Sequence, residues 1–430
     1  MSTIDLARKA RAASYTAATL SEVIKNRALD AVAAAIESST DRILAENAKD
    51  LEGAEQSGLR QALYKRLVLN REKIARIVES VRSVRALRDP IGRTLLRREL
   101  DDGLVLLRVS VPIGVIGVIF ESRPDALVQI ASLCIKSGNA VILKGGSEAL
   151  HTNRVLHSII QDALSSVDPG LQETVQQVET REDIGEMLDL DDLIDLMIPR
   201  GGNELVRTIK ENTKIPVLGH TDGICHMYVH EAADLDAAAE LVYDAKCQYP
   251  AVCNAIETLL VDRAVAADFL PKVVARLESV ELRGDDRARK IAAMAAATDE
   301  DWATEYNDLI LSIRVVDSPD AAIDHIHRYG SHHTDAIVTA DTAVAEAFLS
   351  RVDSSSVLWN ASTRFADGFR YGLGAEVGIS TNKVHARGPV GLEGLTTYKY
   401  RVVGAGHTVA DYADGRKSFS HRDLPIQDAP

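Results

Sequence analysis

The chain has 430 residues, of which 46% are hydrophobic and 26% charged, a mixture typical of two or three folded domains. Its 49 basic and 63 acidic residues give a formal net charge of −14, which disfavours nucleic-acid binding unless a basic patch is segregated. The longest apolar runs, such as residues 111–120, are half the length of roughly 20 residues that a transmembrane helix needs, and the N-terminus has no apolar signal core. We therefore expect a cytoplasmic protein that binds neither nucleic acid nor membrane.

The first 90 residues have the periodicity of α-helices. Apolar side chains recur every four positions at Leu20, Ile24, Ala28, Val32 and Ile36, which places them on one helix face. The pattern continues over residues 41–55, Gly58 is a stop signal, and a further helix is expected over residues 63–87. Arginines lie around the end of this stretch, at positions 85, 88, 93, 97 and 98. We interpret them as a solvated face or a subunit contact rather than a nucleic-acid site.

Residues 95–111 have the pattern of a β-hairpin, because two apolar runs flank Asp101, Asp102 and Gly103, and an Asp-Gly pair favours a tight turn. From residue 115 onward, strands alternate with helices. Strands are expected at residues 115–120, 140–143, 175–178, 193–198 and 216–218, and helices at 125–137, at 147–164 and from near positions 181 and 201. This alternation predicts a parallel sheet covered on both faces, with ligands at the carboxyl ends of its strands.

A second α/β unit begins near Ile224. Its expected helices span residues 235–245 and 264–277, and its expected strands span 255–261 and 310–316. A β-rich segment follows at residues 395–403, and the polar residues 413–430 are expected to form a loose tail. The fold class is therefore α/β, with two parallel sheets.

Two loops have the composition of nucleotide-binding turns. Lys144 and the pair Gly145-Gly146 join a strand to the helix that starts at Ser147, and glycines at a helix start let a ligand approach free N–H groups. The sequence from Arg200 through Gly201 and Gly202 repeats this arrangement. The P-loop motif GxxxxGK[ST] and the Rossmann motif GxGxxG are both absent. Two interpretations of these loops therefore remain possible at this point, a dinucleotide-binding site and a pair of plain tight turns.

The four cysteines are too few for a disulfide framework and match no common zinc spacing. Cys253 lies where a loop containing Pro250 meets a strand, a position that can present a nucleophilic sulfur to a cleft. Cys134 and Cys225 fall on apolar segments and are interpreted as core residues, whereas Cys247, at a helix end, is ambiguous.

Four histidines cluster in the sequence, at positions 325, 327, 332 and 333. Metal binding would need ligands that converge from separate elements, so we interpret the cluster as a polar loop and expect no metal. His220 lies at the boundary between the two units, where a cleft is expected.

Several ordered motifs now identify a family. The runs at residues 111–117, Phe120-Glu121-Ser122-Arg123-Pro124, 144–148, 219–226, 249–258 and 377–389 resemble the signature of the glutamate-5-semialdehyde dehydrogenase (γ-glutamyl phosphate reductase) family of the aldehyde dehydrogenase superfamily. The resemblance spans roughly residues 5–412. It implies NADPH-dependent reduction of L-glutamyl 5-phosphate to L-glutamate 5-semialdehyde with release of phosphate, the second step of proline synthesis from glutamate.

The resemblance also implies the domain organisation. Residues 1–94 and 112–223 correspond to a nucleotide-binding domain, and residues 224–370 to a catalytic domain. Residues 95–111 and 371–412 correspond to a β-hairpin arm that pairs subunits and a C-terminal β segment. A homo-oligomer is therefore expected, and glutamate kinase is a candidate partner that would pass on the labile acyl phosphate.

Site residues are carried over by position. Cys253 matches the nucleophile. The cofactor-binding set is Lys144, Gly146, Ser147, Arg200, Gly201, Gly202 and Glu305. In this set, Lys144 would contact the adenosine ribose, the two glycines at 201 and 202 would lie near the pyrophosphate, and Glu305 would hold the nicotinamide ribose. The substrate-binding set is Arg123, His220, Asn254 and Arg364. For Arg123 and Arg364, structural ion pairs are the equal alternative.

The chain departs from the wider superfamily at three functional positions. The segment that supplies an oxyanion-hole asparagine is replaced by residues 121–124, the second glycine of the GxxxxG motif falls on Val206, and the general-base glutamate falls on His220. Without a water-activating carboxylate, reduction of a thioester on Cys253 is favoured over its hydrolysis. The alternative function is oxidation of another small aldehyde, for which such a glutamate would be expected near residue 220.

Overall fold

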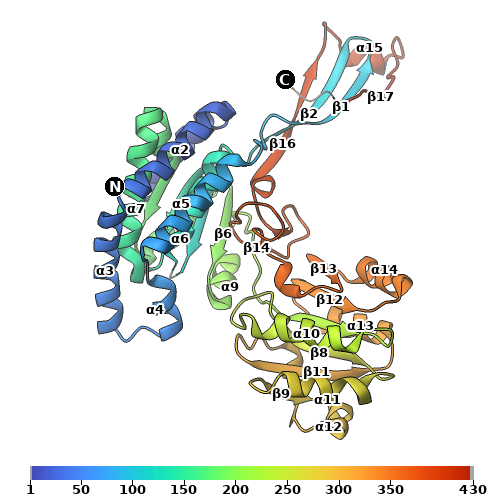
Figure 1. Ribbon diagram of the computed structural model, residues 1–430. Helices are drawn as coiled ribbons and strands as arrows, with labels where there is room; N and C mark the ends of the chain where they lie inside the picture. The colour runs from blue at the N-terminus through green and yellow to red at the C-terminus, as the bar shows by residue number, and fades with distance from the viewer. Residues whose placement is uncertain (1, 122, 427–430) are drawn as a thin grey trace.

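The computed structural model describes residues 2–121 and 123–426 and consists of two α/β units and a projecting antiparallel arm (Figure 1). Ser122, in one of the family-like motifs, lies outside the described residues, as do Met1 and residues 427–430. The α/β fold class is confirmed. Within the described ranges, the helices are too short or too polar to cross a membrane.

The N-terminal helices cover both faces of the first unit's sheet. They are α1 (Thr3–Ala17), α2 (Glu22–Ser38), α3 (Thr40–Gln56), α4 (Gln61–Leu67) and α5 (Arg71–Ala86). Side chains of α2, α3 and α5 belong to the hydrophobic core on one face, and those of α1 to the core on the other. The single helix expected over residues 63–87 is wrong, because the chain leaves the helix at Val68 and restarts after Asn70. The Asn70 side chain accepts a hydrogen bond from the N–H of Lys73, which satisfies a free donor at the start of α5.

The first sheet is parallel, with strand order β5-β4-β3-β6. Its strands are β3 (Val115–Phe120), β4 (Ala140–Lys144), β5 (Val175–Val178) and β6 (Leu196–Arg200). The helices between and after them are α6 (Pro124–Lys136), η1 (Ser147–Ala149), α7 (Leu150–Val167), η2 (Pro169–Thr174), α8 (Arg181–Leu188) and α9 (Asn203–Glu211). The strand expected at residues 216–218 is only an isolated bridge from Val217 to Met197, because the flanking residues do not continue the pairing.

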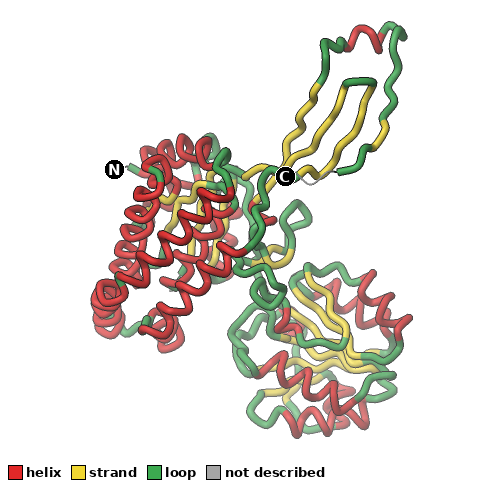
Figure 2. Tube along the Cα trace, turned by 45° about the horizontal axis from the view of Figure 1, so that its top comes forward, coloured by secondary structure: helices red, strands yellow, loops and turns green. Residues whose placement is uncertain are grey.

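The arm is a four-stranded antiparallel sheet of order β16-β2-β1-β17 (Figures 1 and 2). Its elements are β1 (Thr94–Asp101), β2 (Leu104–Pro112), β16 (Thr396–Val403), α15 (Val409–Ala413) and β17 (Arg422–Asp423). The predicted hairpin is confirmed, with Gly103 at φ +68° in the turn. The expected loose tail is wrong for its described part, because β17 pairs with β1 and the N–H of Ser420 donates a hydrogen bond to the carbonyl of Leu100.

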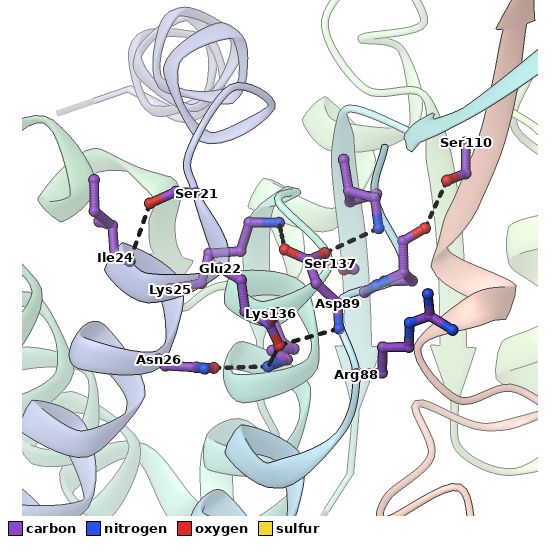
Figure 3. Close-up of polar contacts among 12 residues, drawn as sticks. Ser21, Glu22, Ile24, Lys25, Asn26, Arg88, Asp89, Ser110, Lys136 and Ser137 are labelled. Carbon is purple, nitrogen blue, oxygen red and sulfur yellow. Dashed lines mark hydrogen bonds and ion pairs between the residues drawn. The ribbon is translucent and has the colours of Figure 1, made fainter. Parts of the chain in front are cut away.

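A buried polar network fixes the base of the arm to the helices (Figure 3). The Lys25 ammonium pairs with Asp89 at 2.6 Å, and the carboxylate of Asp89 also accepts the N–H of Ile91. Beside them, the fully buried Lys136 ammonium donates to Glu22, to Asn26 and to the carbonyl of Arg85. Every donor that points into this apolar region therefore has an acceptor, which is the condition for burying a charge.

The second sheet is also parallel, in the order β10-β9-β11-β8-β7-β12-β13. Its strands are β7 (Cys225–Val229), β8 (Ile256–Asp262), β9 (Glu281–Gly284), β10 (Ala295–Ala296), β11 (Ile310–Val316), β12 (Thr334–Val338) and β13 (Ser356–Trp359). The associated helices are α10 (Leu235–Cys247), α11 (Ala266–Arg276), α12 (Asp286–Ile291), η3 (Asp301–Ala303), α13 (Pro319–Tyr329), α14 (Thr342–Arg351) and η4 (Thr363–Phe365).

The chain then returns to the first unit. A short β14 (Ile379–Ser380) pairs with β15 (Gly388–Pro389), and η5 (Glu393–Leu395) leads into the arm. The buried side chains of Val377, Val390 and Leu395 belong to the first unit's hydrophobic core. This return brings residues 376–379 to the boundary between the two units, where they help to line the cleft described next.

Candidate active site

A cleft of about 730 Å³ lies between the two units and is lined by residues of both. Nine of the residues predicted from the sequence line it: Arg123, Arg200, Gly201, Gly202, His220, Cys253, Asn254, Glu305 and Arg364. The other three, Lys144, Gly146 and Ser147, are not among the described lining residues, although β4 ends at the same sheet edge as β3 and β6. One cleft therefore brings together most of the predicted site.

Cys253 lies at the amino-terminal edge of the second sheet. It precedes β8, Gly223 precedes β7 and His333 directly precedes β12, and β7 pairs in parallel with both of the other strands. The predicted nucleophile therefore lies at the opposite end of its strands from the carboxyl-terminal edge at which ligands are expected in the first sheet. A Cβ on Gly223 would lie 2.5 Å from Cys253 Cα, so only glycine lets the two loops approach this closely.

Two histidines lie beside the thiol. One ring nitrogen each of His220 and His333 and the Cys253 sulfur lie within 4.8 Å of one another, and the two rings meet edge to face at 4.7 Å. His220 Nδ1 lies 2.8 Å from the carbonyl of Ile379. Because a carbonyl only accepts, Nδ1 carries a proton, and in the neutral tautomer Nε2 presents the lone pair. His220 is therefore oriented to act as a base toward the thiol.

His333 was grouped with a polar loop by sequence position, and that interpretation is wrong. Its side chain is fully buried, with Nδ1 2.9 Å from the Thr334 hydroxyl and Nε2 without a hydrogen-bond partner among the described residues. His325 and His327 lie elsewhere, on α13. One sequence signal could have located His333 in the site: it immediately precedes an apolar run that is typical of a strand. Because neighbouring parallel strands begin at the same edge of a sheet, residues that precede β12 and β8 lie close together.

Two guanidinium groups act on the thiol electrostatically. Arg200, at the end of β6, and Arg364, in η4, are both close enough to Cys253 for mutual charge interaction. Burial lowers the pKa of each arginine, and for Arg364 the nearby Arg370 lowers the pKa further. Arg364 is held by a hydrogen bond from Nε to Gln248 at 3.0 Å. Fixed cations stabilise a thiolate relative to a thiol, which is what a nucleophilic cysteine needs.

The cleft is richer in cations than the chain as a whole. Its described lining residues include six arginines, Arg60, Arg66, Arg123, Arg200, Arg364 and Arg370, against four carboxylates, Glu121, Glu305, Asp367 and Glu376. Burial raises the pKa of Glu376, which favours the uncharged form of this carboxyl group. Arg60 and Arg66 were not predicted, because nothing in the sequence places α4 and the residue before it against the cleft. This surplus of cations suits an anionic substrate within a chain whose net charge is −14.

The glycine turn after β6 has contacts on both sides. A Cβ on Gly201 would collide with Leu205 and Glu121, whereas one on Gly202 would meet nothing within 4 Å. The N–H of Gly202 donates to the Glu121 carboxylate at 3.1 Å. An anionic ligand that approaches the start of α9 would have to displace this carboxylate.

The neighbouring residues position two further predicted groups. Asn203 donates to both Asp222 and Glu305, at 2.9 and 3.0 Å, which fixes the Glu305 carboxylate in the cleft. Asn254 is buried and donates its amide to the carbonyl of Ala366 at 2.9 Å. The Asn254 side chain therefore already holds the loop that carries the thiol.

The remaining cysteines differ from Cys253 in exposure. Cys134 is fully buried, and burial raises the pKa of its thiol well above the usual range. Burial also raises the pKa of the Cys225 thiol, which donates to the Cys253 carbonyl at 3.1 Å. Cys247 is partly buried at the end of α10, and burial raises the pKa of its thiol as well. Cys253 alone of these four lines the described cleft.

Comparisons with known proteins agree along the whole chain. The profile described as the aldehyde dehydrogenase family matches residues 3–312. Gamma-glutamyl phosphate reductases from Natronomonas pharaonis and a Cyanothece species are each 54% identical, and each match covers 98% of both chains. The crystal structure of a gamma-glutamyl phosphate reductase from Thermotoga maritima is 40% identical with a TM-score of 0.92, over 95% of this chain and 100% of that one. The chain therefore belongs to the gamma-glutamyl phosphate reductases of the aldehyde dehydrogenase family and is an oxidoreductase of that type.

Proposed function

We propose that this enzyme uses NADPH to reduce L-glutamyl 5-phosphate to L-glutamate 5-semialdehyde and phosphate, through a thioester on Cys253. The observation that carries the assignment is the placement of a cleft cysteine beside a histidine and two arginines, Arg200 partly buried and Arg364 buried. The relatives' shared name specifies the acyl phosphate, and the arginine-rich lining supplies the charge that such a substrate requires.

In the first step, His220 Nε2 accepts the thiol proton and the Cys253 thiolate attacks the γ-acyl carbon. The C–S bond forms as the C–O bond to phosphate breaks, so the thioester replaces the acyl phosphate and inorganic phosphate leaves. Arg200 and Arg364 stabilise the anionic groups during this exchange, and Arg123 is positioned in the same cleft to bind a further negative group of the substrate.

The residues present fit a dinucleotide. Space is open beside Gly202, Gly201 lets the turn pack closely against Leu205 and Glu121, and Glu305 is held in the cleft by Asn203. We assign the ribose and pyrophosphate contacts to these residues, to Arg200 and to the Lys144, Gly146 and Ser147 loop at the end of β4. NADPH, when bound, supplies the hydride that reduces the thioester. His220 then returns its proton as Cys253 is released.

We also infer the organisation around this chemistry. Residues 1–94 and 112–223 bind the nucleotide, residues 224–370 carry the nucleophile, and the arm pairs subunits. Glutamate kinase is the candidate donor of the acyl phosphate, because this substrate is labile and its synthesis requires a separate phosphoryl transfer.

The test compares Cys253→Ser with Cys134→Ser in single-turnover NADPH oxidation, beside a cofactor-binding titration. A serine hydroxyl is barely ionised where a thiol is readily deprotonated, so Cys253→Ser should lose more than about 100-fold in turnover and still bind NADPH. Cys134→Ser should retain activity per folded molecule and lose stability, because it buries a hydroxyl on an apolar helix face. Substantial turnover by Cys253→Ser would remove the covalent mechanism.

A further inference from the structure

The cluster around Cys253 has the composition of a metal site as well as of a catalytic site. It contains one sulfur and two imidazole nitrogens within 4.8 Å of one another, contributed by His220, Cys253 and His333 from three separate segments of the chain. A set of one thiolate and two imidazoles is a ligand type that zinc uses in proteins. Convergence from separate segments is the condition that metal binding by the histidine-rich stretch at residues 325–333 required, and His333 is the residue of that stretch that meets it.

The free nitrogens of the cluster are suited to metal binding. His220 Nδ1 is taken by the Ile379 carbonyl and His333 Nδ1 by the Thr334 hydroxyl, so Nε2 is the available ligand atom of each ring. His333 Nε2 is buried and has no hydrogen-bond partner among the described residues, which is a cost that a metal ion would remove. In metal sites of proteins, a hydrogen bond to the ring nitrogen that does not bind the metal commonly orients the histidine.

The distances require only a small adjustment. Zinc–sulfur and zinc–nitrogen bonds of about 2.3 and 2.1 Å place tetrahedral ligands roughly 3.5 Å apart, against an upper limit of 4.8 Å in the structure. Since Cys253 lies in a loop, a side-chain rotation can supply much of the difference. A fourth position would face the cleft and remain open to water.

We propose that His220, Cys253 and His333 form a three-ligand site that binds Zn²⁺ reversibly and thereby blocks the enzyme. Binding forms one Zn–S and two Zn–N bonds and releases the thiol proton to solvent, with no change of oxidation state. The inhibitory part of the proposal rests on the nucleophilic role proposed for Cys253, whereas the binding part does not. Arg200 and Arg364 oppose a dication at this position, so the affinity should be moderate and the inhibition should be reversed by a chelator.

The experiment titrates the full-length enzyme with Co²⁺, as a spectroscopic substitute for Zn²⁺, and separately with Zn²⁺ against a chromogenic chelator. The wild-type protein should bind one equivalent, with a near-ultraviolet thiolate-to-cobalt band. His220→Gln and His333→Gln should each weaken binding at least about tenfold, and Cys253→Ser should abolish the band. The matched controls, Cys247→Ser on α10 and the exposed His327→Gln on α13, should bind like the wild type.

The outcomes separate the two proposals. Absence of the thiolate band, or unchanged binding in both His220→Gln and His333→Gln, would overturn the metal site. If His333→Gln does not fold, His220→Gln decides, because that side chain lies at the surface of the cleft. Zn²⁺ that binds at the cluster without loss of turnover would overturn the inhibition. Turnover by Cys253→Ser would refute the covalent mechanism and leave the metal test standing.

Discussion

At the scale of single residues, burial determines the charge of one histidine, His325. His325 is buried against the rings of Trp302 and Tyr329, and its Nδ1 accepts a hydrogen bond from Arg314 at 2.8 Å. Burial, with His226, Arg314 and Arg328 nearby, lowers the pKa of His325 to about 2. The ring is therefore neutral in the folded protein at any pH at which the enzyme would be studied.

This neutral ring makes the fold sensitive to acid. The unfolded chain takes up a proton at His325 below pH 6.5, whereas the folded chain does not until about pH 2, so stability falls with pH across that window. His325→Gln keeps an acceptor for Arg314 and removes the titrating group. The variant should lose about 2 kcal/mol less unfolding free energy between pH 7 and pH 5 than the wild type.

The measurement is chemical denaturation of the second unit at both pH values. His327→Gln is the control, because that histidine is exposed on the same helix and its removal should leave the acid sensitivity as it is. If wild type and His325→Gln lose the same unfolding free energy between pH 7 and pH 5, the buried His325 ring is not the source of the acid sensitivity.

At the scale of elements, the buried network at the foot of the arm couples α2 to the start of the hairpin. Lys25 is 1% exposed, and burial lowers the pKa of its ammonium despite the opposing effect of Asp89. Asp89 lies between α5 and β1, so the ion pair ties the arm's first connection to the helical layer (Figure 3). The sequence showed only that the helices end near this residue.

Removal of one charge of this pair should be costly. Asp89→Asn leaves the Lys25 ammonium buried without a counter-charge, and such changes destabilise proteins by about 3 kcal/mol or more. Glu37→Gln is the matched control, because it breaks an exposed pair with Arg82 and should change stability little. The measurement is the denaturant midpoint of each variant. Similar midpoints for Asp89→Asn and Glu37→Gln would show that the ion pair between Lys25 and Asp89 does not stabilise the foot of the arm.

Sequence patterns predicted the elements well and their ends less well. Apolar periodicity located α2, the hairpin, the four strands of the first sheet and two strands of the second, β8 and β11, because each of these elements has one clear apolar face or a fully buried run. It joined α4 to α5, since Val68 and Leu69 continue the apolar pattern across a break that only the Asn70 cap marks. It also missed β12 and α13, where four histidines in a polar stretch concealed a buried helix face and a buried strand.

The parts of the candidate site that depend on local sequence could be predicted, whereas the parts that depend on contacts between distant elements could not. Cys253 and the glycine turns occupy loop positions that the sequence shows directly. His333 reaches the Cys253 thiol because β12 lies beside β7, and Arg66 reaches the cleft because α4 packs toward the boundary. Neither arrangement is encoded in nearby residues. Lys144 differs from both, because it lies at the end of its predicted strand as expected but is not among the described residues that line the cleft.

At the scale of the whole molecule, the arm presents an unusual surface. The strand β16 pairs with β2 on one side and is an edge of the described sheet on the other. Tyr400 and Val402 on this strand are 57% and 58% exposed, and their neighbours Tyr398 and Val403 are exposed as well. A long, apolar edge strand pairs readily with another chain, so we expect β16 to be an interface between copies of this protein.

The double substitution Tyr400→Lys/Val402→Lys should therefore shift the protein to a smaller species. The two positions lie two residues apart on one face of β16, and paired lysines would oppose their counterparts across any symmetric contact. Multi-angle light scattering at micromolar concentration gives the mass, and circular dichroism checks that the secondary structure is retained. Val23→Lys, at an exposed position on α2, is the control and should keep the wild-type mass. A monomeric wild type, or a double variant of unchanged mass, would contradict assembly through this edge, because the charge would then lie on a surface that no other chain covers.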